Sequence, residues 1–220
     1  MDVQIDKWSP YYRQKYHVIG VLLLSAVLYL YAVLIGEKVF WVVASAVTAG
    51  IHQGAVAAIW RSEIHGCSMT RIFGAKSFMI HGCLFFILLA TRLGSIVFAS
   101  VNSPHTFSVP SILTEFAALC ISVLGLWTLW SVFKHFGVKR ALGADHFFSE
   151  YKHKKFVRKG VFLYIPNSMY TFGTLLFLIP GLIFRSQIGF ACGLFHYLAV
   201  WLHYWATELP DMEYIYGCRS

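Results

Sequence analysis

An acidic segment near the C-terminus, YWATELPDMEYIYG (204–217), carries groups that could bind a cation. It follows a long apolar run, at a place where membrane helices more often end in Lys or Arg, because those long side chains reach the interface. Here the run ends on Glu208, with His203 shortly before it. A carboxylate and aromatic rings both attract cations, so this end of the chain is a candidate ligand site.

Two other segments hold polar groups of matching chemistry, LGADHF (142–147) in a polar loop and YIPNSMYTFG (164–173) at the start of an apolar run. Their candidate residues are Asp145, His146, Asn167, Tyr170 and Gly173. Aromatic residues expected nearby are Trp127, Trp130, Phe147, Phe172 and Trp205. If the fold brings these segments together, they form a pocket for a cationic, adenosine-sized ligand. Otherwise they are helix caps and interfacial aromatic residues.

The elements that must position these groups are apolar helices. The chain has 220 residues, of which 58% are hydrophobic and only 13% charged, and a soluble domain could not bury so much apolar surface. Since about 20 apolar residues span the hydrocarbon core as a helix, the sequence predicts an all-α integral membrane protein. The expected spans are 17–36, 39–60, 77–98, 111–133, 168–184 and 187–206. Only Arg185 and Ser186 separate the last two, which predicts a tight helical hairpin; five spans result if that pair does not cross fully.

The distribution of basic residues predicts the orientation. Of the 18 lysine and arginine residues, 15 fall on the side of the N-terminus, and only Lys38 and Arg185 fall on the opposite side. This bias predicts that both termini and the long polar loop 134–166 are cytoplasmic. The net charge of +8 then reflects topology and attraction to anionic lipid, and no nucleic-acid partner is expected. A bacterial inner membrane and the endoplasmic reticulum both fit this topology.

Other kinds of site are disfavoured. The ten histidines show none of the HxxxH, HxxHH or HExxH spacings of metal enzymes, and no GxSxG motif is present, so we predict no metal and no serine nucleophile. The five cysteines are scattered and are expected to be small core residues. Arg92 and Glu115 lie at similar depths in consecutive apolar segments, where we expect a structural ion pair.

Three blocks within residues 111–220 resemble the membrane-embedded methyltransferases, namely the phosphatidylethanolamine N-methyltransferases and, more distantly, the isoprenylcysteine carboxyl methyltransferases. The blocks are KHFGVKRALGADHF (134–147), NSMYTFG (167–173) and ELPDMEYIY (208–216). The matching residues are Gly137, Asp145, Phe147, Asn167, Met169, Tyr170, Gly173, Glu208, Pro210, Ile215 and Tyr216. Residues 1–110, expected to form the first three membrane helices, resemble no family.

The resemblance implies S-adenosylmethionine as cosubstrate, bound at the cytoplasmic face between the last helices. Glu208 matches the first residue of the family's acidic pair, with Leu209 in the second place, and Gly125 matches the second glycine of a G-x-G motif, with Val123 in the first. The implied cofactor-binding residues are Gly125, Asn167, Tyr170, Gly173, His203 and Glu208. An amine acceptor must lose a proton, and the catalytic candidates are Asp145, His146 and Tyr170.

The implied activity is methyl transfer to the amine of a phosphatidylethanolamine-type headgroup, with a membrane lipid as substrate. The alternatives are methylation of a prenylcysteine carboxylate or a small apolar thiol, and a non-catalytic membrane scaffold. Basic residues of the polar loop would hold the lipid phosphate or simply face anionic lipid, namely Lys152, Lys154, Lys155 and Arg158. The sequence does not indicate an oligomeric state.

Overall fold

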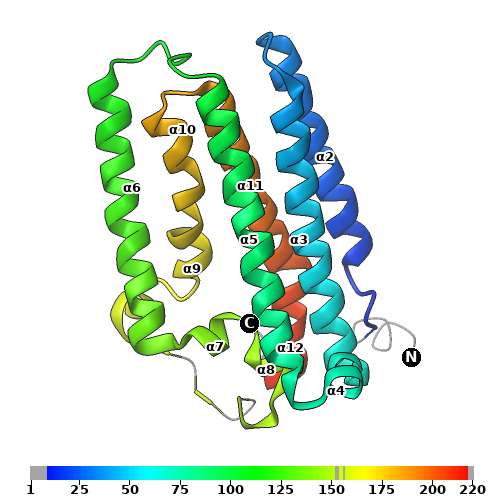
Figure 1. The fold of residues 1–220 in the computed structure, drawn as a ribbon. Coiled ribbons are helices and arrows are strands. Elements are labelled where there is room, and N and C mark those ends of the chain that lie inside the picture. The colour runs from blue at the N-terminus through cyan, green and yellow to red at the C-terminus, as the bar shows by residue number, and fades with distance from the viewer. Residues whose placement is uncertain (1–8, 152–153, 156, 218–220) are drawn as a thin grey trace.

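The computed structural model describes residues 9–151, 154–155 and 157–217, and every regular element in these ranges is a helix (Figure 1). Four helical stretches are long and apolar enough to cross a membrane: Gln14–Leu34, Val39–Gly66, Ser68–Asn102 and Ser111–Phe136. The all-α integral membrane class is thus supported. A crossing by the last pair of segments, and the cytoplasmic placement of the termini, stay predictions.

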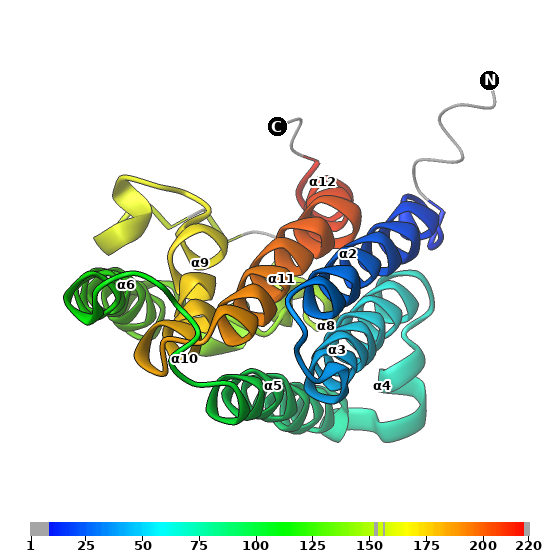
Figure 2. The same ribbon diagram turned by 90° about the horizontal axis from the view of Figure 1, so that it is seen from above.

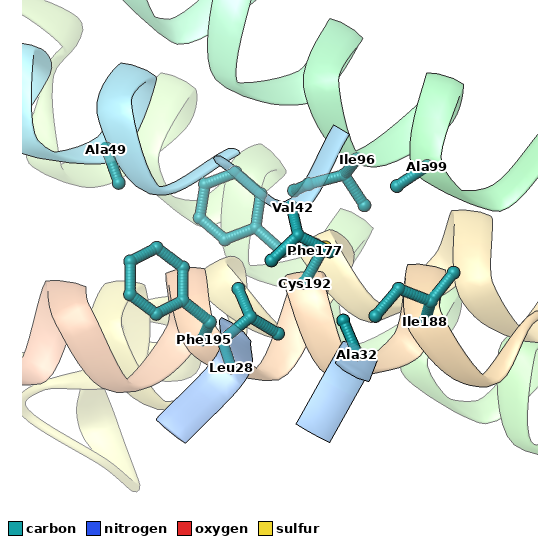
Figure 3. Packing of buried hydrophobic residues seen from close by; sticks show 10 residues of the cluster. All are labelled: Leu28, Ala32, Val42, Ala49, Ile96, Ala99, Phe177, Ile188, Cys192 and Phe195. Carbon is teal, nitrogen blue, oxygen red and sulfur yellow. The ribbon is translucent and has the colours of Figure 1, made fainter. Parts of the chain in front are cut away.

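The long helices are α2 (Gln14–Leu34), α3 (Val39–Gly66), α5 (Ser77–Asn102), α6 (Ser111–Ser131) and α11 (Gln187–His203). The short helix α4 (Ser68–Phe73) and the 3-10 turn η1 (Gly74–Lys76) join α3 to α5. Figure 2 shows α11 in the middle of the bundle, with α2, α3 and α5 on one side and α6 on the other. The buried apolar cluster in Figure 3 lies along this central helix, where Phe195 and Cys192 meet Leu28, Val42 and Ile96.

The predicted helical hairpin is present, although its first arm is irregular. That arm consists of α9 (Ser168–Thr171), the 3-10 segment η5 (Gly173–Leu178) and α10 (Ile179–Ile183). Pro180, in the first turn of α10, has no N–H for the preceding turn, which accounts for the break in regular α-helix. At the tip, the Ser186 hydroxyl accepts a hydrogen bond from the Gly189 N–H and caps α11. Gly181 is required there because a Cβ would meet the backbone of Phe190.

The prediction of an ion pair between Arg92 and Glu115 is wrong. α10 packs against both α5 and α6, so the two side chains lie on helices that it separates. Arg92 is buried and donates from Nε to His196 Nδ1 at 2.9 Å, with its Nη1 at 3.3 Å from His52 Nδ1. Glu115 is exposed on α6. The helices α5 and α6 are therefore consecutive in the sequence but do not pack directly against each other.

The expectation for the cysteines is confirmed only for Cys192, which is buried; Cys67, Cys83 and Cys120 are exposed, and Cys218 lies outside the described residues. On helices that cross a membrane, an exposed cysteine contacts lipid at little cost, because its side chain is weakly polar.

The segments with candidate residues gather at one end of the bundle, the lower end in Figure 1. There α6 continues as a π-helical turn, η2 (Val132–Phe136), followed by the short helices α7 (Val138–Ala141) and α8 (Ala144–Phe147). After the 3-10 turns η3 (Ser149–Tyr151) and η4 (Gly160–Leu163), the chain enters α9 at the same end. α11 continues as the π-helical turn η6 (Tyr204–Glu208) and ends in α12 (Leu209–Tyr216).

Candidate functional site

A cavity of about 590 Å³ lies at this end of the bundle. Its wall combines the end of α3, the η2–α8 region, the segment 157–170, η6 and α12. The lining is apolar and aromatic with a few polar groups, as in most small-molecule sites, and its volume suits a cosubstrate of nucleoside size.

The cavity brings five of the predicted site residues together: Asp145, His146, Asn167, Tyr170 and Glu208. The other three do not line it. Gly125 lies where α6 packs closely on η5, since a Cβ there would meet Leu176, and Gly173 faces Thr128 on α6. His203 is buried behind the wall, with its ring 5.8 Å from that of Trp60 and 5.2 Å from that of His17.

Glu208 is half-buried and reaches the cavity from the end of η6, beyond the predicted last span. Its Oε2 atom is buried and has no hydrogen-bond partner within the part of the chain that the structure describes. Burial, and then the nearby carboxylates of Asp211 and Asp145, raise the pKa of Glu208 to about 8. An unpaired carboxyl of this kind gains most from a bound cation, because the cation offsets both burial and repulsion.

Asp145 provides a second carboxylate with a free oxygen. Its Oδ2 accepts a hydrogen bond from the Tyr216 hydroxyl and lies 3.4 Å from Arg140 Nε. Its Oδ1 is buried and unpartnered among the described residues. Arg140 also donates to the Tyr216 oxygen at 3.0 Å, and burial together with the Asp145 carboxylate raises the pKa of Tyr216. The tyrosine therefore keeps its proton and donates a hydrogen bond to Asp145 Oδ2, which leaves Oδ1 without a partner among the described residues.

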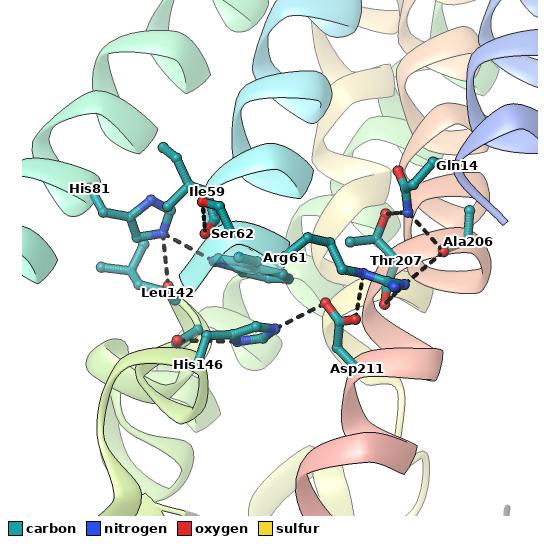
Figure 4. A network of polar contacts seen from close by, with 12 residues as sticks. Gln14, Ile59, Arg61, Ser62, His81, Leu142, His146, Ala206, Thr207 and Asp211 are labelled. Carbon is teal, nitrogen blue, oxygen red and sulfur yellow. Dashed lines mark hydrogen bonds and ion pairs between the residues drawn. The ribbon is translucent and has the colours of Figure 1, made fainter. Parts of the chain in front are cut away.

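His146 is held through both ring nitrogens in a polar network (Figure 4). Its Nδ1 lies 3.2 Å from the Gly143 carbonyl and its Nε2 lies 3.2 Å from Asp211 Oδ2. The Trp60 ring stacks on the imidazole with centroids 4.3 Å apart. Gly143 has φ 79° and no side chain, and a Cβ there would collide with Trp60. His146 thus forms a fixed part of the wall.

The sequence interpretation missed several residues of this site. Trp60 comes from α3, within the half of the chain that resembles no family, and no local pattern marks it. Asp211 is 2% exposed and forms an ion pair with Arg61, with Asp211 Oδ1 2.6 Å from Arg61 Nε. The sequence feature that could have identified Asp211 is its position as a second acidic residue, three places after Glu208. None of the five expected aromatic residues lines the cavity, whose large rings are Trp60, Phe136, Phe162, Tyr164, Tyr170 and Tyr204.

The lining carries three carboxylates and two guanidinium groups, namely Asp145, Glu208, Glu213, Arg140 and Arg158. Arg158 is exposed, whereas Arg140 is buried and tied to Asp145 and to the Lys155 carbonyl. In the described ranges, no three His, Cys, Asp or Glu side chains gather so as to hold a metal ion. The unpartnered carboxyl oxygens of Asp145 and Glu208, in a lining rich in aromatic rings, suit the cavity to an organic cation.

Comparison with known proteins agrees with this chemistry. Residues 113–219 match the phospholipid methyltransferase family. Neither a curated protein nor a solved structure gives a match. The matched segment contains every residue of the cavity lining except Trp60. The resemblance found in the sequence is thus confirmed for residues 113–219, which match a family of membrane methyltransferases of phospholipid metabolism.

Proposed function

We propose that this protein transfers a methyl group from S-adenosylmethionine to the amine of a lipid headgroup, at the cytoplasmic face of the membrane. The observation that carries the proposal is the buried, unpartnered Oε2 of Glu208 in an aromatic cavity. That cavity is formed almost entirely by the segment that matches the methyltransferase family.

The residues present fit the proposed cosubstrate. S-adenosylmethionine supplies an activated methyl group on a sulfonium, and a cation of this kind suits a carboxylate beside aromatic rings. Glu208 would hold the cation, and Tyr170 and Tyr204, whose rings lie 4.8 Å apart, would supply apolar surface. Asn167 donates from Nδ2 to the Tyr204 hydroxyl at 3.2 Å, which fixes this side of the cavity.

The electrostatics favour an amine acceptor over a carboxylate. The Asp145 carboxylate, and Glu208 in its ionised form, would repel the carboxylate of a prenylcysteine, whereas they attract an ammonium group. Arg158, an exposed cation in the same lining, is placed to hold the phosphate of a headgroup. Of the other basic residues considered for this role, Lys154 and Lys155 are exposed and outside the lining, and Lys152 lies outside the described residues.

An apolar rim would let a lipid remain in the bilayer while its headgroup reaches the cavity. Leu163 and Tyr164 belong to the lining, yet they are 61% and 72% exposed. The Tyr164 ring lies 6.1 Å from that of Trp127 on α6, and the exposed side chains of Trp130 on α6 and Phe133 on η2 follow it in the chain. Exposed apolar side chains in a membrane protein face lipid, so this rim provides a route from the bilayer to the cavity.

The amine must lose a proton before it can attack the methyl group. We assign proton acceptance to Asp145, because its Oδ1 is free while Tyr216 and Arg140 stabilise the charge on Oδ2. His146 is engaged through both nitrogens and instead fixes the wall. Tyr170 and Glu208 would orient the cosubstrate, so that the chain mainly aligns donor and acceptor.

Titration of the purified protein in detergent with S-adenosylhomocysteine tests cosubstrate binding. Saturable heat with one site supports the proposal, and no heat at millimolar ligand refutes it and leaves a scaffold role. Transfer of radiolabelled methyl groups into a lipid extract then assigns the acceptor. Label in lipid amines supports an amine acceptor, whereas label only in protein carboxylates or a volatile thioether contradicts it.

A further inference from the structure

The π-helical turn η6 is followed by Pro210, which cannot donate the backbone hydrogen bond that would continue the helix. Pro210, in the first turn of α12, has no backbone N–H. In an α-helix that N–H would bond to the carbonyl of Ala206, and in a π-helix to that of Trp205. A buried carbonyl without a partner is costly, and Ala206 is fully buried, so donors from another part of the molecule stabilise this turn.

Side chains from the N-terminal half supply these donors. Arg13 Nη1 donates to the Trp205 carbonyl at 3.1 Å, and Gln14 Nε2 donates to the Ala206 carbonyl at 3.1 Å. Arg61 Nη2 donates to the carbonyls of Ala206 and Thr207 at 3.4 and 3.3 Å (Figure 4). Residues outside the family-matched segment therefore complete a turn inside it.

Arg61 contacts the chain on both sides of Glu208. Besides its bonds to the carbonyls before Glu208, its Nε lies 2.6 Å from Asp211 Oδ1, three residues after it. Both side chains of this ion pair are buried, at 6% and 2% exposure. The second oxygen of Asp211 faces His146 at 3.2 Å, which ties the same turn to the opposite wall of the cavity.

We propose that Arg61 is a positioning residue of the methyltransferase site, which acts by holding η6 and α12 so that the Glu208 carboxylate points into the cavity. The inference rests on the proposed function, because cosubstrate binding is its readout. It also gives residues 1–112 a role, since α3 supplies both this anchor and the Trp60 wall.

The experiment compares S-adenosylmethionine binding by full-length Arg61→Gln and Arg61→Lys variants in detergent, with Lys15→Gln as the matched control. Lys15 is an exposed cation at the same end of the bundle and does not line the cavity. We expect Arg61→Gln to weaken binding about tenfold or more, the scale of one charged hydrogen bond. Arg61→Lys, which keeps the charge facing Asp211 but loses the guanidinium fork, should fall between Arg61→Gln and wild type.

A double-mutant cycle separates positioning from a general structural role. If Arg61 acts through Glu208, then Arg61→Gln should have little further effect in a Glu208→Gln background. An equal loss of binding in both backgrounds overturns the inference, and so does wild-type affinity in Arg61→Gln. Should Arg61→Gln fail to fold, the same cycle with Arg61→Lys decides by the same criterion. Failure of the wild type to bind would instead refute the proposed function.

Discussion

Replacing Glu208 with glutamine removes the charge that the cavity offers to a cation while keeping the size of the side chain. The pKa of Glu208 is raised to about 8 by burial and by the carboxylates of Asp211 and Asp145. Near neutral pH the empty protein therefore holds this carboxyl mainly protonated. A cationic cosubstrate binds best to the ionised form, so binding should release a proton.

The magnitude follows from the ionised fraction. With a pKa of about 8, roughly one molecule in a hundred is ionised near pH 6 and about half near pH 8, so wild-type affinity should rise about fiftyfold over this range. The stability of the folded protein changes with pH in the opposite direction. Because the folded-state pKa exceeds the ordinary 4.5, the free energy of unfolding should fall as pH rises from 4.5 to about 8, by on the order of a few kcal/mol.

Calorimetric titration of S-adenosylmethionine at several pH values measures the first effect, and thermal unfolding in detergent measures the second. Glu208→Gln should flatten both profiles relative to wild type, while ionisation of the ligand itself is common to the two proteins. Glu150→Gln, which removes an exposed carboxylate of the neighbouring loop, should keep the wild-type profiles. Equal pH dependence in wild type and Glu208→Gln would refute the role that we assign to this carboxylate.

Two further substitutions test the cavity wall and the hairpin. Tyr170→Ala should weaken cosubstrate binding roughly tenfold by removing a ring that packs against Tyr204, with thermal unfolding unchanged within a few degrees; wild-type affinity in titration calorimetry would contradict this placement. Gly181→Ala should lower the free energy of unfolding by about 3 kcal/mol or more, because the new Cβ would meet the backbone of Phe190. Gly94→Ala is its control, since nothing lies within 4 Å of a Cβ there, and equal unfolding midpoints for the two variants would contradict the tight hairpin.

Several polar residues that reach the cavity from the C-terminal half were predictable. Asn167, Tyr170 and Glu208 stand at the ends of apolar runs, and the two-residue link at Arg185 and Ser186 forces those ends together. Asp145 was a candidate from the polar segment 142–147 and from its block of resemblance. By contrast, small residues in apolar helices have the same pattern whether they contact a ligand or another helix, and Gly125 packs on Leu176 outside the cavity lining.

What the sequence alone determined is therefore the helical membrane class, the hairpin, and the acidic and aromatic character of one end of the bundle. These follow from hydropathy, chain connectivity and residue type, all of which are local. Only the tertiary structure decided that Arg92 meets His196 and not Glu115, because an intervening helix separates α5 from α6. It also decided that Arg61 anchors the turn that carries Glu208. Such pairings depend on which helices pack together, and packing partners distant in the chain leave no mark in a single sequence.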